Sequence, residues 1–277
     1  MRIAIVGTGI AGNVVAHRLH PAHDITVFES ASRIGGHANT IEVVSGDATL
    51  KLDTGFMVFN ERTYPKFCAL LKELEVGSQD TAMSFSVRRE TSGLEYCGSS
   101  LNALFAQRAN LLRRSFHRML RDIVRFNRAA SEGLDDIAES TTLGEYLEAG
   151  QYSREFARDY LVPMGAAIWS NPPDTLPAMP ARFFVRFFHN HGLLTFRDRP
   201  QWRVIRGGAE TYVSKLVAGH QHRIRLNSPV NSIARRGGRV VVRSCGRSES
   251  FDRIFIACHS DQALRLLEDA SGAEREV

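Results

Sequence analysis

The chain has few cysteines and no long apolar run, and both absences narrow the class of protein. The four cysteines, Cys68, Cys97, Cys245 and Cys258, are scattered, without a CxxC pair or a histidine at metal-ligand spacing. They predict reduced thiols in a cytoplasmic protein and no metal site. No apolar stretch is long enough to span a bilayer. The N-terminus is a glycine-interrupted strand after a charged residue, which does not fit a signal peptide.

Internal repeats and low-complexity tracts are also missing. The 277 residues are 43% hydrophobic and 23% charged, which is ordinary for a globular protein with one large or two modest domains. The net charge of +5 permits attraction to anionic surfaces. No nucleic-acid-binding motif accompanies that charge, so we expect no nucleic-acid partner.

The first 36 residues hold a strand, a glycine turn, a helix, a second strand and an acid. The apolar run Arg2–Val6 leads directly into Gly7-Thr-Gly-Ile-Ala-Gly12, and Asn13–Leu19 predicts a helix. A second apolar run, Ile25–Phe28, ends at Glu29. This order and spacing predict a βαβ dinucleotide-binding unit, because the glycine motif lies in the structural context that it requires.

Each residue type in this motif has a physical role. Gly7 permits a tight turn, Gly9 lets a pyrophosphate approach the backbone, and Gly12 lets the helix pack closely on the sheet. The N–H groups at the helix start favour phosphate charge. Glu29 can accept hydrogen bonds from a ribose diol. A glycine turn alone is common, but here the context favours a nucleotide site over a structural turn.

A second glycine pair follows the ribose acid. Arg33 stands just before Gly35 and Gly36, and a nicotinamide domain has no evident need for either feature. A flavin dinucleotide lies extended, so it needs a second close approach of backbone and a cation near its phosphates. The pair therefore favours FAD over NAD.

With Leu52-Asp-Thr-Gly-Phe56 added, the sequence resembles the FAD-dependent amine oxidase superfamily, which includes monoamine oxidases and phytoene desaturases. It is most similar to a bacterial group of predicted NAD/FAD-binding oxidoreductases. The resemblance implies an α/β fold with a Rossmann-like, glutathione-reductase-like FAD domain and an inserted α+β, largely helical substrate domain. Residues 1–60 and 205–277 would form the FAD-binding domain, and residues 61–204 the substrate or cap domain.

The resemblance also implies which residues bind FAD. A glycine at position 55 lets backbone pass near the flavin, and Val230 contacts the adenine through its backbone. For Asp53, a role at the cofactor site and a structural role as a turn or cap residue are equally favoured. The expected cofactor-binding residues are Gly7, Gly9, Ile10, Ala11, Gly12, Glu29, Ser30, Arg33, Gly35, Gly36, His37, Gly55, Phe56 and Val230.

Two stretches of the inserted region each have two interpretations. Leu101–Glu139 has a strongly helical pattern. Its arginine stripe from Arg114 to Arg128 is either a solvated face, which is favoured, or a peripheral contact with an anionic membrane. The aromatic segment Phe183–Phe188 is either core, which is favoured, or the wall of a tunnel for an apolar small-molecule substrate.

The function predicted from this resemblance is that of an FAD-dependent oxidoreductase, which removes hydride from an amine or an apolar, lipid or fatty-acyl substrate. An NAD-dependent dehydrogenase and a non-catalytic nucleotide-binding remnant are the alternatives. No catalytic residue is assigned, and His37, His189, His191 and His259 are candidates that also fit structural roles.

The C-terminal segment differs from the superfamily pattern. Relatives have a final glycine-rich stretch beside the flavin, whereas this chain reaches Val277 through polar residues. We therefore expect a truncated product that lacks part of the flavin pocket. Such a product would expose apolar surface and form oligomers or dissolve poorly.

Overall fold

A computed structural model describes residues 1–195 and 200–276, which form two compact units. Unit 1 comprises Met1–Phe59, Tyr64–Thr81 and Arg203–Val277, and unit 2 comprises Asn60–Thr63 and Ala82–Trp202. Tyr64–Thr81 thus packs with unit 1, although the sequence analysis put it in the inserted region. The predicted domain ranges also include residues 196–199 and 277, which lie outside the described residues.

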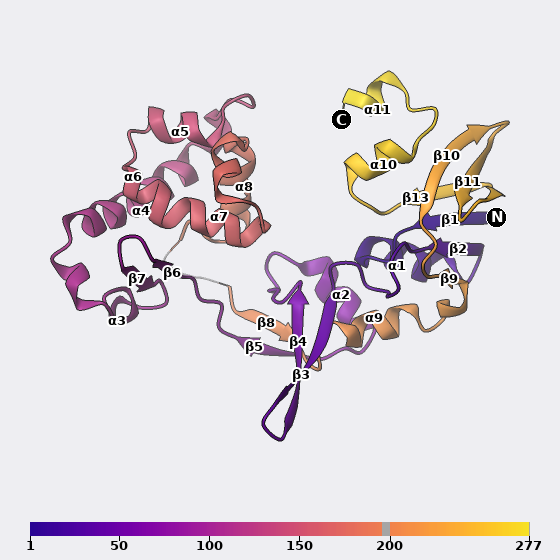
Figure 1. The fold of residues 1–277 in the computed structure, drawn as a ribbon, viewed down its shortest axis with the longest axis horizontal. Helices are drawn as coiled ribbons and strands as arrows, with labels where there is room; N and C mark the ends of the chain where they lie inside the picture. Colours follow the sequence, from indigo (N-terminus) through magenta and orange to yellow (C-terminus); the bar gives the residue numbers. More distant parts are fainter. Residues whose placement is uncertain (196–199, 277) are drawn as a thin grey trace. The chain divides into compact units, whose positions relative to one another are not determined.

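A four-stranded parallel sheet, in the order β13-β1-β2-β9, forms the centre of unit 1 (Figure 1). Its strands are β1 (Arg2–Val6), β2 (Asp24–Phe28), β9 (Ile224–Arg225) and β13 (Arg253–Ile256). The apolar runs of β1 and β2 are buried, as expected for parallel strands covered on both faces. Helix α1 (Ile10–Leu19) is the crossover between these two strands.

A three-stranded antiparallel sheet packs against the parallel one. It comprises β10 (Val230–Arg236), β11 (Arg239–Ser244) and β12 (Arg247–Phe251). The rings of Phe28 and Phe251 meet edge to face, with centroids 6.0 Å apart. Helix α10 (Ser260–Leu266) lies beside β10, and helix α11 (Gly272–Glu276) follows it.

Strands β3 (Asn39–Ser45) and β4 (Ala48–Gly55) form an antiparallel ribbon. The turn residue Gly46 has a φ of +61°, a conformation that suits glycine. Register places Ile41 opposite Leu52 on one face, and both are exposed.

A second core of unit 1 lies around Tyr212 and Phe59. It includes α2 (Pro65–Glu73) and α9 (Glu210–Val217), and nearby β5 (Ser78–Thr81) pairs with β8 (Trp202–Ile205). Asp53 Oδ1 accepts hydrogen bonds from the Ala209 N–H at 2.9 Å and the Thr40 hydroxyl at 2.6 Å. Asp53 therefore caps α9 from β4, which supports the cap role.

Unit 2 is largely helical, with one hairpin. Its core gathers aromatic side chains, among them Phe126, Phe156 and Phe184. Its elements are β6 (Ser86–Arg89), β7 (Leu94–Cys97), α3 (Leu101–Leu104), η1 (Arg108–Leu111), α4 (Arg114–Glu132), η2 (Leu134–Asp136), α5 (Leu143–Ala149), α6 (Arg154–Phe156), η3 (Ala157–Leu161), α7 (Val162–Trp169), η4 (Pro173–Ala178) and α8 (Ala181–Asn190).

The helical character predicted for Leu101–Glu139 is confirmed, and the segment is divided into α3, η1, α4 and η2. Ser100 caps α3 through a hydrogen bond from the Ala103 N–H. The buried Asn110 side chain donates to the Glu95 carbonyl, 3.1 Å away. Such side-chain bonds compete with a continuous helix.

Most of the aromatic segment of α8 packs in the core, the interpretation favoured from the sequence, whereas Phe183 is exposed. Phe184 and Phe188 are buried and stack with centroids 4.3 Å apart. Trp169 packs on the same side chains from the end of α7. No helix within residues 1–195 and 200–276 has the length and apolar content needed to cross a membrane.

His220, between α9 and η5 (Gln221–Arg223), is a buried histidine without a hydrogen-bond partner among the described residues. Its ring centroid lies 5.3 Å from that of His20. Burial lowers the pKa of His220 to about 4, and neighbouring basic groups add to this effect. These groups are His20, His17, Arg223 and His222.

We expect His220 to make unit 1 sensitive to acid. The unfolded chain protonates this group near pH 6.5 and the folded chain only near pH 4, so the free energy of unfolding falls as pH drops through that window. His220→Phe should remove this slope, about one proton taken up per unfolding event. Urea unfolding between pH 7 and 4.5 measures it.

The exposed His222→Gln variant is the matched control and should keep most of the slope. Equal slopes in His220→Phe and the parent protein would contradict this explanation.

Candidate dinucleotide site

The turn between β1 and α1 can be built only with glycine at two positions. Gly7 has a φ of +99°, and a Cβ there would lie 2.8 Å from the Ala257 carbonyl oxygen. A Cβ on Gly12 would lie 2.0 Å from the Gly7 carbonyl oxygen. Main chain therefore packs on main chain, which brings the helix start close to the carboxyl ends of β1 and β13.

Gly9 differs, because a Cβ built on it meets no atom within 4 Å and its φ of −64° suits any residue. It is the N-cap of α1, yet no side chain caps this helix and its first turn holds no acid. Ile10 and Ala11 are exposed. The N–H groups and positive dipole end of α1 thus meet open space, the arrangement that binds phosphate.

The glycine pair Gly35 and Gly36 contacts the glycine turn between β1 and α1. A Cβ on Gly36 would lie 2.8 Å from the Gly9 Cα, and Gly35 donates its N–H to the Thr8 carbonyl at 3.0 Å. Arg33 donates to the carbonyls of Gly36 (2.7 Å) and Ala38 (3.2 Å). The guanidinium therefore holds the second turn against the first.

Glu29 links the turn to the end of β2. Its Oε2 accepts the Thr8 N–H at 2.8 Å and the Thr8 hydroxyl at 2.5 Å. Its Oε1 accepts the Ala31 N–H at 2.8 Å and the Ser30 hydroxyl at 3.3 Å. Burial raises the pKa of Glu29, but these hydrogen bonds outweigh it and the net pKa is lowered. The carboxylate is therefore held ionised.

Gly55 packs on the backbone of His37, and Phe56 follows it. A Cβ on Gly55 would lie 2.1 Å from the His37 carbonyl oxygen. Phe56 has a φ of +54°, a conformation that bulky residues rarely adopt, and its exposed ring contacts Phe67 at 5.0 Å. Strained residues of this kind concentrate at functional sites.

The approach to Val230 runs along the end of β2. Ser228 donates its N–H to the Glu29 carbonyl at 2.8 Å, and Glu29 donates to the Arg225 carbonyl at 2.9 Å. Val230 then begins β10, half-buried against Phe28. The predicted adenine contact therefore follows the segment that pairs with the ribose acid.

The histidine candidates separate by unit. His37 and His259 come together in unit 1, with ring centroids 5.5 Å apart. In unit 2, His189 lines a cavity, whereas the His191 ring stacks on Phe187 at 3.9 Å. The stacking fits a structural role for His191.

Two buried polar residues that hold the β1–α1 turn were not predicted from the sequence. Thr8 is buried and binds Glu29 through two atoms. Asn13 is buried in α1 and donates to the Thr8 carbonyl at 2.7 Å. Their position in the sequence could have revealed them, because polar residues within an otherwise apolar and glycine-rich motif need hydrogen-bond partners when they are buried.

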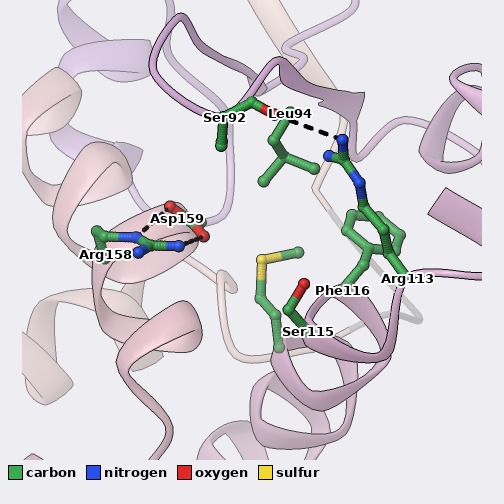
Figure 2. Close-up of a pocket in the computed structure, with 8 residues that line it drawn as sticks. Ser92, Leu94, Arg113, Ser115, Phe116, Arg158 and Asp159 are labelled. Atoms are coloured by element: carbon green, nitrogen blue, oxygen red, sulfur yellow. Dashed lines mark hydrogen bonds and ion pairs between the residues drawn. The ribbon is translucent and has the colours of Figure 1, made fainter. Parts of the chain in front are cut away.

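In the described part of unit 2 we consider two cavities, neither of which is lined by a predicted cofactor residue. One, of about 210 Å³, lies between the hairpin turn, the start of α4 and the π-helical turn η3 (Figure 2). There the buried Asp159 accepts hydrogen bonds from Arg158 at 2.8 and 2.6 Å. The other, of about 420 Å³, includes Arg62 and His189.

The geometry of unit 1 defines a class: an α/β protein with a dinucleotide-type turn on a parallel sheet. The family model of flavin containing amine oxidoreductases matches residues 10–274, so the chain belongs to that family. The family relationship predicted from the sequence, a flavin-dependent oxidoreductase family with FAD as its cofactor, is confirmed. No curated protein sequence matches the chain.

Solved structures share the fold at low sequence identity. Cyclohexylamine oxidase from Brevibacterium oxydans IH-35A is 20% identical, with a TM-score of 0.75 over 98% of this chain and 61% of that one. Putrescine oxidase bound to putrescine is 16% identical, with a TM-score of 0.72 over 100% and 63%.

A fatty acid isomerase from P. acnes that produces CLA is 16% identical, with a TM-score of 0.68 over 99% of this chain and 62% of that one. The chain thus spans about three fifths of the length of these structures.

We expect Gly12→Ala and Gly9→Ala to differ in stability. The new methyl group at position 12 meets the Gly7 carbonyl, and such overpacking costs about 1–3 kcal/mol or more. At position 9 the methyl group meets open space, so the change should stay below about 1 kcal/mol. Thermal and urea unfolding of both variants measure this, and equal losses would contradict the packing described above.

Proposed function

We propose that unit 1 binds FAD across the two glycine turns and that the chain serves flavin-dependent oxidation of an amine. The observation that carries the proposal is the open, uncapped start of α1 at Gly9, because a built Cβ there meets nothing within 4 Å. A diphosphate needs both the space and the N–H donors at such a helix start. The family match supports flavin as the dinucleotide.

The diphosphate would lie over Gly9, with the N–H groups of Ile10, Ala11 and Gly12 as donors. Gly35 and Gly36 bring a second stretch of bare main chain to the same place. Arg33 uses two donor atoms on its own loop, and a guanidinium has five N–H donors, so others remain for phosphate. We assign His37, Gly55 and Phe56 to the flavin side, and Val230 to the adenine.

Glu29 suits the ribose because of the donors that it already has. Two of its four hydrogen bonds come from fixed backbone N–H groups and two from the hydroxyls of Thr8 and Ser30. Hydroxyl groups can rotate, so two ribose hydroxyls can replace them. The lowered pKa keeps the carboxylate an acceptor at neutral pH.

When bound, FAD accepts a hydride from a substrate C–H bond. We propose an amine as that substrate, because the family is one of amine oxidoreductases. The alternative, an apolar or fatty-acyl substrate, was based on the aromatic segment Phe183–Phe188. It has weaker support now that Phe184 and Phe188 lie in the core.

Three further expectations belong to the same proposal. The four free cysteines support a cytoplasmic location. Self-association stays a prediction that light scattering tests. Membrane contact through the Arg114–Arg128 stripe also stays a prediction. Several of these arginines already bind groups of their own chain.

We expect the purified protein to be yellow and to release FAD on denaturation. Gly9→Ala should keep its stability and lose at least tenfold in FAD affinity, because the methyl group occupies the path of the diphosphate. Mass spectrometry of the released ligand and titration of stripped protein with FAD measure both. Gly272→Ala is the matched control, since its Cβ also meets nothing within 4 Å.

Release of a nicotinamide dinucleotide would replace the flavin proposal with a dehydrogenase. Loss of the flavin's visible absorbance after anaerobic addition of amines, but not of fatty acids, would support the amine. A protein that binds FAD yet is reduced by no donor would contradict the proposed activity while leaving the site intact.

A further inference from the structure

One stretch of unit 2 has charges of a single sign. Between Glu95 and Asp122 the chain contains no aspartate or glutamate, but it contains five arginines and His117. This stretch forms α3, η1 and the first turns of α4. An acid-free stretch of this length is a local concentration of positive charge.

The same stretch exposes aliphatic side chains. Leu101 is 78% exposed, Leu111 50% and Leu112 89%. A single exposed leucine is ordinary, but three strongly exposed leucines within twelve residues are a local concentration of exposed apolar side chains. We call Leu101, Arg108, Leu111, Leu112, Arg113 and Arg114 the leucine–arginine tip.

Polar and aromatic contacts hold the tip in place. Ser100 caps α3, and Gln107 donates to the Gly93 carbonyl at 2.7 Å. The Phe105 ring packs edge to face on Phe116, with centroids 5.6 Å apart. His117 Nε2 lies 2.9 Å from the Leu111 carbonyl oxygen. The leucines are therefore presented outward on an ordered base.

Among the residues that the structure describes, the arginines of the tip have no carboxylate partner. Arg108 donates to the Phe105 carbonyl and the Asn102 side chain, and Arg113 donates weakly to the Ser92 carbonyl at 3.4 Å. Within residues 1–195 and 200–276, Arg114 has no polar partner. Arg113 and Arg114 also lie at the positive end of α4, whose first turn has no acid. An external anion would relieve this repulsion.

Further along α4, residues of the same chain pair with the arginine side chains. Arg118 pairs with Glu155 at 3.5 Å, and Arg128 pairs with Glu132 at 3.1 Å. Arg125 stacks over the Tyr152 ring at 4.4 Å. The stripe along the helix is therefore largely a satisfied protein surface, whereas the tip is not.

We propose that the leucine–arginine tip binds an anionic lipid bilayer, with the leucines inserted among the acyl chains and the arginines on the lipid phosphates. Exposed aliphatic groups with nearby arginines that bind no carboxylate among the described residues match the two layers of such a surface. A nucleic acid would use the arginines but has no place for the leucines, and single strands favour exposed aromatic rings. The proposal is independent of the cofactor site.

The test is co-sedimentation of the full chain with vesicles of phosphatidylcholine, with and without phosphatidylglycerol. We expect binding only to the anionic vesicles, and weaker binding as salt is raised. The double variant Leu111→Ser, Leu112→Ser should lose at least about tenfold in binding, since each buried methylene contributes to partition. Arg108→Gln with Arg114→Gln should lose binding to a similar extent.

Two controls on α4 match these changes. Val124→Ser removes an apolar side chain that is 57% exposed, and Arg128→Gln removes a cation that is already paired. Both should bind as the parent chain does, and flavin content and thermal unfolding should be unchanged in all variants. No binding to anionic vesicles, equal binding by the leucine variant, or binding to an oligonucleotide that displaces the vesicles would overturn the proposal.

Discussion

Direct packing of main chain on main chain is the constraint on which unit 1 depends. The Gly7 carbonyl lies where a Cβ of Gly12 would be, and the Gly9 Cα lies close to where a Cβ of Gly36 would be. The Gly7–Gly12 turn thus meets both the second turn at Gly36 and the main chain at Ala257 without side chains between them. This packing leaves the start of α1 open above Gly9, because the turns fill the space below and beside it.

Glu29 gives that arrangement its polarity. A buried carboxylate needs hydrogen bonds from several donors, and this one obtains them from Thr8 in the glycine turn and from Ala31 just after β2. The carboxylate oxygens that hold this turn are the atoms that the proposed ribose contact would use. Loop stability and nucleotide affinity are therefore linked through one side chain.

Local patterns carried the sequence analysis wherever the contacts themselves are local. The strand, turn and helix of residues 2–19 follow from apolar runs and glycine, and Thr142 with Glu145 forms the capping box that begins α5. The family relationship also followed from short motifs. The roles of individual residues at the cofactor site stay a prediction.

Distant contacts explain most of what the sequence analysis did not predict. The division of Leu101–Glu139 into several helices involves distant contacts such as that of the Asn110 side chain with the Glu95 carbonyl, which no helical pattern reveals. Strand β12 is polar and is stabilised by pairing with β11. The meeting of His37 with His259 depends on the whole parallel sheet. The pairing of the α4 arginines likewise needed Glu155 and Tyr152 from other elements.

A crystal structure of the protein with FAD tests the central claim most directly. The account predicts the diphosphate oxygens about 3 Å from the N–H groups at the start of α1, above Gly9, with the ribose hydroxyls on Glu29. Density for the diphosphate elsewhere, with protein atoms filling the space above Gly9, would contradict it.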